Sequence, residues 1–358
     1  MKGRVLIAGF STRHVAQSAH KAGYEVCSVD HFCDQDLAWY TKDREKFEDL
    51  AGLPDAIERI CRRHRFDFFI PTSGAEELEI PINSPKSSQK TIAQFMDKLD
   101  TQHFFDRNNI PVPRILPQDQ YPIMAKPRKG AGGWRNAILN DPAAETAWES
   151  LYPGVPYIRQ EVIKGVPASV CCVATGTSAM AIAANSQILR GNGESAFGFS
   201  GSMTPFSHPD TGRMIALAER IAALSGCRGT IGIDFVLGEK MPYAIEINPR
   251  FQGTVDTVER ACGCNLFSSH INACAGILPA SRPPCGQVAV RSILFADRDL
   301  TIKADLAVLK DFVADIPWPG TILEEDQAIV SIYGWGSTEE SALALLDKHI
   351  TIVRQYMR

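Results

Sequence analysis

The sequence predicts an α/β protein whose first part is a doubly wound parallel sheet and whose middle part is antiparallel. Residues 4–71 alternate apolar runs with helical patterns in the order βαβαβ, which is typical of a parallel sheet with its ligand edge at the strand C-termini. From residue 122 to 206, short apolar runs alternate instead with glycine and proline turns, which favours antiparallel strands. At 358 residues the chain suits two to three such units, each with an ample core.

Each element of the first part follows from its pattern. The run at 4–8 is apolar throughout, as expected of a buried parallel strand, and Gly9 ends it. We expect strands at 4–8, 24–30 and 66–71, and helices at 13–22 and 43–65. The Ser- and Pro-rich connector at 84–88 then separates this unit from the rest of the chain.

The remaining elements are expected in the following order. The pattern predicts a helix at about 91–108 ended by prolines at 111 and 113, a helix at 210–225, a hairpin at 229–250, a helix near 255–275, strands around 287–295 and 328–333, and a closing helix from 337. No internal repeat and no low-complexity tract interrupts this order.

Composition excludes several classes of protein. The net charge of −4 gives no general attraction to nucleic acid or to an anionic membrane surface, and no apolar run reaches membrane-spanning length. The apolar stretch at the N-terminus is too short for a signal peptide. The ten cysteines lie mostly in apolar runs and include no pair of pairs at zinc-finger spacing. We therefore expect reduced thiols in a cytoplasmic protein.

The predicted hairpin carries the strongest functional signal. Asp234 lies on its first strand and Glu246 on its second, and on a hairpin the two acids can face each other. Glu246, Asn248 and Arg250 alternate, so their side chains point to one face of the strand. Two carboxylates, an amide and a guanidinium on one surface indicate a site for divalent metal and phosphate. A packed hairpin core is the poorer explanation, because unpaired charge on a buried face is costly.

A second candidate is the lysine and glycine-rich loop at 126–133. Lys126 ends an apolar strand, and the backbone N–H groups of the loop that follows it can close over a polyphosphate. The loop is not a P-loop, because no Gly-Lys-Ser/Thr follows. The alternative is a merely flexible hairpin, but three cationic side chains flank the loop.

Two further segments leave their interpretation open. Gly9 after the first strand and Asp30 at the end of the second invite a dinucleotide site, but Ser11 and His14 occupy the positions where further glycines are needed. The helix N-terminus at 11–12 could still hold a carboxylate. The strand at 157–165, followed by Ser169, could clamp an adenine between apolar walls, or it could be a plain edge strand.

Taken in order, these residues resemble the ATP-grasp superfamily over nearly the whole chain. The resemblance is to the carboligase branch related to biotin carboxylase, without a biotinyl domain. It rests on the Asp-Lys pair at 97–98 with the Pro-x-Pro exit at 111–113, on Lys126 with its loop, and on the hairpin. Asn109 replaces a usual glycine, and Asp234 stands where a glutamate is more common.

The resemblance implies a role for each candidate residue. The implied nucleotide-binding residues are Lys98, Lys126, Gly130, Gly132, Gly133, Gln160, Glu161, Val162, Ile163 and Ser169, the implied metal ligands are Asp234, Glu246 and Asn248, and the implied catalytic residues are Arg250 and Lys126. Three domains are implied: an α/β domain at 1–88, an ATP-grasp domain of two α+β subdomains clamping ATP at 89–282 with a lid at about 119–163, and a small β-rich α+β subdomain at 283–358.

The resemblance also implies an activity. ATP and Mg²⁺ (or Mn²⁺) activate a small-molecule carboxylate as an acyl phosphate, and an amine then displaces phosphate to form an amide. An amino-acid ligase such as a tyramine–glutamate ligase is one specific form. The alternatives are a bicarbonate-activating, carboxylase-like enzyme and a nucleotide-binding module without turnover. The sequence does not define the oligomeric state, although two-fold homodimers are the commonest assembly.

Overall fold

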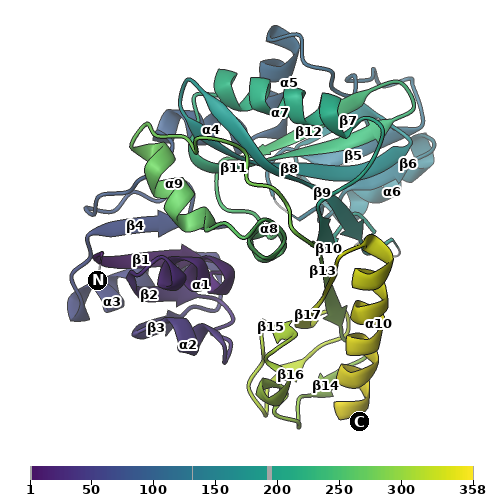
Figure 1. The fold of residues 1–358 in the computed structure, drawn as a ribbon. Helices are drawn as coiled ribbons and strands as arrows, with labels where there is room; N and C mark the ends of the chain where they lie inside the picture. The colour runs from purple at the N-terminus through teal and green to yellow at the C-terminus, as the bar shows by residue number, and fades with distance from the viewer. Residues whose placement is uncertain (1, 131, 192–195, 358) are drawn as a thin grey trace.

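The structure is a computed structural model that describes residues 2–130, 132–191 and 196–357. Ala131, within the predicted glycine loop, lies outside the described residues. Figure 1 shows the N-terminal part, in purple, below a large sheet in teal and green, and the C-terminal part, ending in a long yellow helix.

The N-terminal part is a four-stranded parallel sheet in the order β3-β2-β1-β4. Its elements are β1 (Arg4–Gly9), α1 (Arg13–Lys21), β2 (Glu25–Asp30), α2 (Leu37–Tyr40), β3 (Asp43–Lys46), η1 (Leu50–Gly52), α3 (Leu53–Arg63) and β4 (Phe68–Pro71). The predicted doubly wound parallel unit is therefore confirmed.

The predicted helix at 43–65 is wrong in its first part. Residues 43–46 form the edge strand β3, and the helix begins only at Leu53. Asp43 and Glu45 point to one face of β3, where Arg63 of α3 approaches them to 2.9 and 2.6 Å. The charges at 43–46 therefore belong to a solvated edge strand, and its two acids pair with α3. They do not form one face of a helix.

The helix predicted at 91–108 is two helices, α4 (Gln89–Phe95) and α5 (Lys98–Arg107). Asp97 breaks it, because its carboxylate accepts from the backbone N–H of Leu99 at 2.8 Å and so caps a new helix. Arg128 also contacts the Asp97 carboxylate, at 2.7 Å. The start of α5 is thereby tied to the loop that follows Lys126.

A three-stranded antiparallel sheet in the order β6-β5-β7 follows. Its elements are β5 (Ile123–Pro127), β6 (Ala137–Leu139), α6 (Pro142–Leu151) and β7 (Tyr157–Glu161). The sequence predicted strands only in this region, so α6 was missed. Its signal was local: Asp141 caps the helix by accepting from the N–H of Ala144, and Pro142 takes the first helical position.

An eight-stranded sheet forms the body of the molecule, in the order β12-β11-β8-β9-β10-β13-β17-β15. Its strands are β8 (Gly165–Thr175), β9 (Ala179–Leu189), β10 (Phe199–Thr204), β11 (Arg228–Gly238), β12 (Pro242–Asn248), β13 (Val288–Phe295), β15 (Val313–Ala314) and β17 (Ala328–Gly336). Smaller elements are the β14 (Leu300–Thr301) and β16 (Ile322–Leu323) pair and η2 (Leu306–Leu309). Because β13 pairs with β10, the C-terminal strands continue this sheet. The domain limits at 88/89 and 282/283 stay a prediction.

Helices cover both faces of the large sheet. They are α7 (Thr211–Leu224), α8 (Val255–Cys262), α9 (Leu266–Cys274) and α10 (Glu339–Tyr356). Alternate residues of β8 enter different cores: Val170 and Cys172 lie in the cluster that includes α7, whereas Cys171 and Val173 lie in the cluster that includes α1, α8 and α9. The helix predicted near 255–275 is divided by Gly263, whose φ of 61° lies in the left-handed region.

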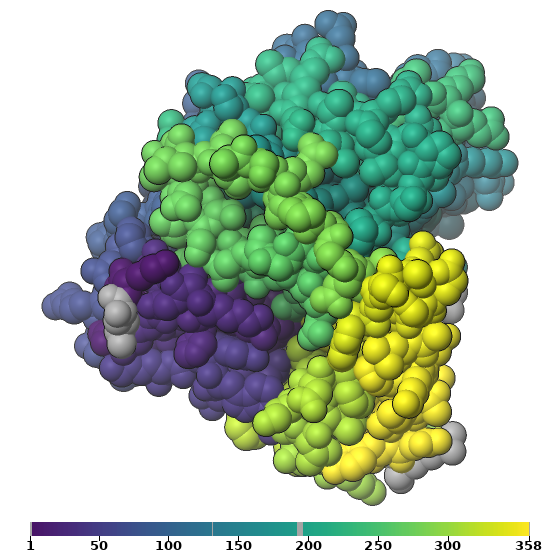
Figure 2. Space-filling view, in the orientation of Figure 1, coloured from purple at the N-terminus to yellow at the C-terminus, as the bar shows by residue number. Residues whose placement is uncertain are grey.

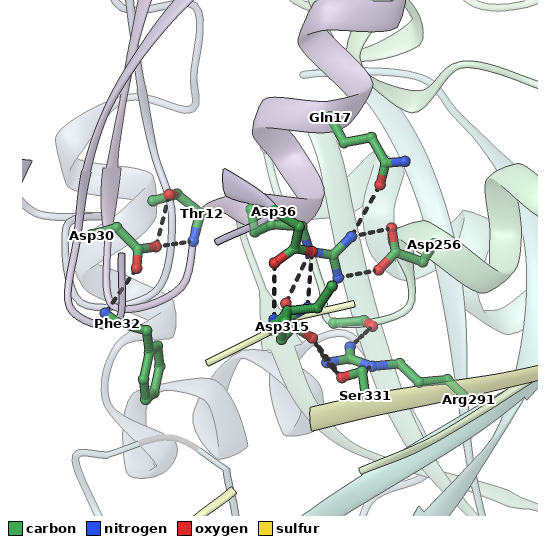
Figure 3. A network of polar contacts seen from close by, with 12 residues as sticks. Thr12, Gln17, Asp30, Phe32, Asp36, Asp256, Arg291, Asp315 and Ser331 are labelled. Carbon is green, nitrogen blue, oxygen red and sulfur yellow. Dashed lines mark hydrogen bonds and ion pairs between the residues drawn. The ribbon is translucent and has the colours of Figure 1, made fainter. Parts of the chain in front are cut away.

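The N-terminal part, α8 and the C-terminal part meet at a buried ion-pair network. Arg13 of α1 is 2% exposed, and its guanidinium contacts Asp256 at 2.6 Å, Asp315 at 2.9 Å and Asp36 at 3.4 Å. Figure 3 shows these carboxylates converging on one guanidinium, with Arg291 beside them. In Figure 2 the purple part accordingly lies against the yellow-green segment of the C-terminal part, below the green part. Burial would lower the pKa of Arg13, but Asp256 and Asp315 outweigh it and hold that pKa well above its usual value.

A buried histidine gives a testable link between pH and stability. His270 of α9 accepts at Nδ1 from the N–H of Thr230 at 2.9 Å and donates from Nε2 to the carbonyl of Pro85 at 2.7 Å. Burial lowers its pKa to about 4. Since an unfolded histidine titrates near about 6.5, the unfolded state takes up the proton first, and stability falls as pH drops from about 6.5 to about 4.

We expect His270→Gln to lose less of its free energy of unfolding between pH 7 and pH 5 than the wild type loses. Urea unfolding at the two pH values measures this difference. His103→Gln, at an exposed position on α5, is the control and keeps the wild-type dependence. Equal pH dependence in all three proteins would show that His270 is not the linked group.

No helix among the described residues is both long and apolar enough to cross a membrane.

Candidate active site

The two acids of the predicted hairpin face each other. Asp234 of β11 is the register partner of Glu246 in β12, and the sheet continues on the other side of Asp234 to Ser169 in β8. A bulge follows this pair, because Phe235 is paired with Ala244 and Ile245 is left as the extra residue. The bulge was not predicted, but it leaves the two carboxylates on one face of the hairpin.

The Asp234 carboxylate is held by two amides. Gln187 of β9 donates to Oδ1 at 2.9 Å, and Asn248 donates to Oδ2 at 3.0 Å. Burial, and after it the neighbouring Glu246 carboxylate, raise the pKa of Asp234 to about 7, while Arg250 opposes the shift. Two carboxylates in partial burial form a place where a divalent cation would relieve like-charge repulsion.

Both predicted lysines reach this hairpin from other elements. The Lys98 ammonium lies 3.5 Å from Glu246 Oε1 and donates to the carbonyl of Gly130 at 2.9 Å. Lys126 on β5 is 8% exposed, and burial lowers its pKa to about 8, although Glu246 opposes the shift. The start of α5, the glycine loop and the hairpin are therefore brought together as the sequence predicted.

Arg250, two residues beyond the end of β12, is anchored from the N-terminal part. Its Nε donates to Oε1 of Glu76 at 2.7 Å, and its Nη2 donates to Oδ1 of Asn248 at 3.2 Å. Glu76 is buried and accepts at its other oxygen from the N–H of Gly74 at 2.7 Å. Glu76 was not among the predicted residues, because 174 positions separate it from Arg250 and no local pattern marks the pair.

The segment predicted to hold the base joins β7 to β8. Gln160 is 2% exposed, its amide nitrogen donates to Gln102 at 2.7 Å, and its amide oxygen is buried without a partner among the described residues. Glu161 is instead engaged by Arg114 at 2.9 Å. Its backbone N–H also donates to the carbonyl of Arg114 at 2.9 Å. Val162 lies between β7 and β8.

The other predicted residues occupy the following positions. Ser169 is 4% exposed and accepts at 3.3 Å from Asn185, its register partner in β9. Ile163, also between β7 and β8, lies where a side chain at Gly238 would meet it at 3.0 Å. Gly132 has an open surrounding, whereas a side chain at Gly133, where φ is 74°, would meet the carbonyl of Phe197. Glycine is therefore required at 133 by the close approach of another loop.

The Asp30 carboxylate, considered above for a dinucleotide site, is engaged by backbone N–H groups of its own domain. Its Oδ2 accepts from the backbone N–H of Thr12 at 2.6 Å, and its Oδ1 accepts from the N–H groups of Phe32 and Cys33 at 2.8 Å. The helix N-terminus at 11–12 holds a carboxylate, as the sequence suggested, but it is the carboxylate of Asp30. The cavity beside Arg13, of about 400 Å³, is lined by the junction residues and not by the hairpin.

The fold and the family comparison agree on one class of protein. Residues 95–254 match the family model of the ATP-grasp domain. This range includes both lysines, the hairpin and Arg250. The predicted ATP-grasp fold is confirmed.

Two sequence relatives and two solved structures are similar to this chain. An uncharacterized protein of Methanocaldococcus jannaschii is 26% identical over an alignment of 365 positions that covers 92% of this chain and 87% of that protein. The carbamoyl phosphate synthase large chain of Myxococcus xanthus is 23% identical over an alignment of 279 positions that covers 70% of this chain and 26% of that protein. The present chain thus spans only about a quarter of that second relative.

Both solved structures share the fold along almost the whole chain. Biotin carboxylase of Campylobacter jejuni, in complex with a β,γ-ATP ligand, has a TM-score of 0.77 at 15% identity and covers 97% of this chain and 90% of its own. L-amino acid ligase of Bacillus licheniformis has a TM-score of 0.72 at 16% identity and covers 97% of each chain.

Proposed function

We propose that this protein is an ATP- and Mg²⁺-dependent ligase that joins a small-molecule carboxylate to an amine through an acyl phosphate. The observation that carries the proposal is the convergence of two carboxylates, two lysines and one arginine on the β11–β12 hairpin, from elements far apart in the sequence. The solved structures with this fold include an L-amino acid ligase and a biotin carboxylase, which supports a reaction of this class.

The residues suit an adenine nucleotide. The buried amide oxygen of Gln160 lacks a donor among the described residues, and the exocyclic amino group of adenine is such a donor. A buried acceptor without a partner is costly, so a base that supplies the missing N–H is favoured over one that presents another acceptor. This orphaned oxygen supports the placement of the base beside residues 160–163.

The residues also suit a magnesium ion held together with phosphates. Asp234, Glu246 and Asn248 offer two carboxylates and one amide oxygen, which are ligands that Mg²⁺ prefers. Among the described residues no group of three or more His, Cys, Asp or Glu could hold a metal by itself. The nucleotide phosphates would therefore complete the coordination shell. Bound Mg²⁺ would neutralise charge that develops on the transferring phosphoryl group.

The chain's own residues would position the reactants. Lys98 and Lys126 neutralise phosphate oxygens, and Arg250, fixed by Glu76, orients the carboxylate. A carboxylate oxygen bonds to the γ-phosphorus as the bond to the β-phosphate oxygen breaks and ADP leaves. The amine nitrogen then bonds to the acyl carbon as the C–O bond breaks, phosphate leaves, and the amine proton passes to solvent. The glycine loop excludes water that would hydrolyse the acyl phosphate.

Coupled measurement of ADP release tests this function over a matrix of carboxylates and amines, with bicarbonate as a separate arm. We expect release to require a carboxylate and to be accompanied by amide formation when an amine is present. An amino acid paired with an amine is the first combination to examine, and glutamate with tyramine is one such pair. ADP release that requires bicarbonate alone would favour the carboxylase-like alternative. ATP binding without ADP release in any arm would favour a non-catalytic module.

A further inference from the structure

Three aromatic side chains gather at the carboxyl ends of β1 and β2, and the proposed mechanism uses none of them. The rings of Phe10 and His31 are stacked, with centroids 4.5 Å apart and planes 11° from parallel. Phe32 packs edge-on against both, at 5.2 and 4.8 Å. Phe10 and Phe32 are each 41% exposed, so the cluster offers open aromatic surface. The carboxyl edge of a parallel sheet is where such folds bind ligands.

The cluster is held in place from behind. The Asp30 carboxylate binds the backbone N–H groups of Thr12 and Phe32, which fixes the two loops that carry Phe10 and Phe32. Figure 3 shows the Phe32 ring projecting away from this carboxylate. His31 Nδ1 lies 3.2 Å from the carbonyl of Phe47. The rings are thus preorganised, which lowers the entropic cost of stacking a ligand on them.

A continuous chain of contacts leads from the cluster to the candidate active site. The backbone N–H of Phe10 donates to the carbonyl of Ser73 at 2.7 Å. The next residue, Gly74, donates to Oε2 of Glu76 at 2.7 Å, and Oε1 of Glu76 accepts from Arg250 at 2.7 Å. The loop at 73–76 is therefore hydrogen-bonded both to the backbone of Phe10 and to the guanidinium assigned to the reacting carboxylate.

We propose that Phe10, His31 and Phe32 form a subsite for an aryl ring carried by one of the two co-substrates. This inference rests on the proposed function, because that function places the reacting groups at Arg250. An aryl ring can stack offset on the exposed phenylalanine faces or pack edge-on against them, and both arrangements are favourable beyond burial alone. A saturated ring of similar size gains binding free energy only from burial. The subsite therefore binds an aryl ring more tightly than a saturated one.

Ligand-observed NMR titration with a non-hydrolysable ATP analogue present tests the subsite directly. The probes are 2-phenylethylamine and 3-phenylpropanoate, each compared with its cyclohexyl counterpart. We expect one aryl probe to bind about 10-fold more tightly than its cyclohexyl counterpart. The probe that shows the preference identifies whether the amine or the acid carries the ring.

Phe10→Leu with Phe32→Leu is expected to remove this preference while leaving affinity for the ATP analogue unchanged. Tyr356→Leu, an equally exposed aromatic on α10 at 44%, is the matched control and keeps the preference. Equal binding of aryl and cyclohexyl probes by the wild type, or a preference that survives the double variant, would overturn the subsite. This test measures binding, so its result does not depend on whether the protein forms ADP. Loss of ADP formation with an intact aryl preference would count against the proposed function instead.

Discussion

Replacing Glu246 with glutamine is expected to lower Mg²⁺-dependent ADP formation at least about 100-fold, since even indirect partners of a metal ligand contribute 10- to 100-fold. The substitution keeps the size of the side chain but removes the carboxylate that faces Asp234 and lies 3.5 Å from Lys98. The proposed metal ion and Lys98 would each lose a partner. Steady-state ADP release at varied Mg²⁺ concentration measures the effect.

Glu239→Gln is the matched control for this prediction. Glu239 lies in the turn of the same hairpin and is exposed, so its replacement is expected to leave the rate unchanged. Circular dichroism and the thermal midpoint establish that both variants are folded. Near-normal turnover in Glu246→Gln would contradict the proposal that the hairpin supplies metal ligands.

Replacing Arg13 with methionine is expected to lower the free energy of unfolding by about 3–5 kcal/mol, the cost of leaving buried charges without their partner. Asp256 and Asp315 would lose the guanidinium that they contact at 2.6 and 2.9 Å. Burial alone would raise the pKa of Asp256, but Arg13 holds that pKa at about 2. Urea unfolding followed by tryptophan fluorescence measures the change.

Arg62→Met provides the comparison for Arg13→Met. Arg62 pairs with Glu58 one turn away on α3, and both side chains are more than 60% exposed. An exposed pair of this kind contributes about 0–1 kcal/mol. If the two substitutions cost the same, the junction network does not stabilise the three-part arrangement.

Much of the fold could be predicted because it depends on local pattern. The apolar run of β1, the alternation in β12 and the turn at 238–240 each define an element without reference to the rest of the chain. Breaks within elements were harder, since Asp97 and Gly263 interrupt helices whose apolar pattern continues past them. A single cap or left-handed residue outweighs periodicity there.

Some residues of the candidate site could be predicted from local pattern, and others could not. Asp234 and Glu246 could be identified together because one hairpin carries both. Gln187 and Glu76 could not, because their partners come from distant strands and a lone Gln or Glu carries no pattern of its own. The aromatic cluster was missed for a related reason. Phe10 and Phe32 are adjacent only because β1 and β2 are paired in parallel, which brings their exits to one edge.

Transfer of isotope from the carboxylate to phosphate tests the central claim most directly. The carboxylate found in the ADP-release screen is labelled with ¹⁸O in both oxygens, and the released phosphate is examined by mass spectrometry. An acyl phosphate intermediate predicts that each phosphate carries one ¹⁸O atom, because the C–O bond breaks when the amine attacks. Phosphate without ¹⁸O, formed together with the amide, would contradict activation of the carboxylate by ATP at this hairpin.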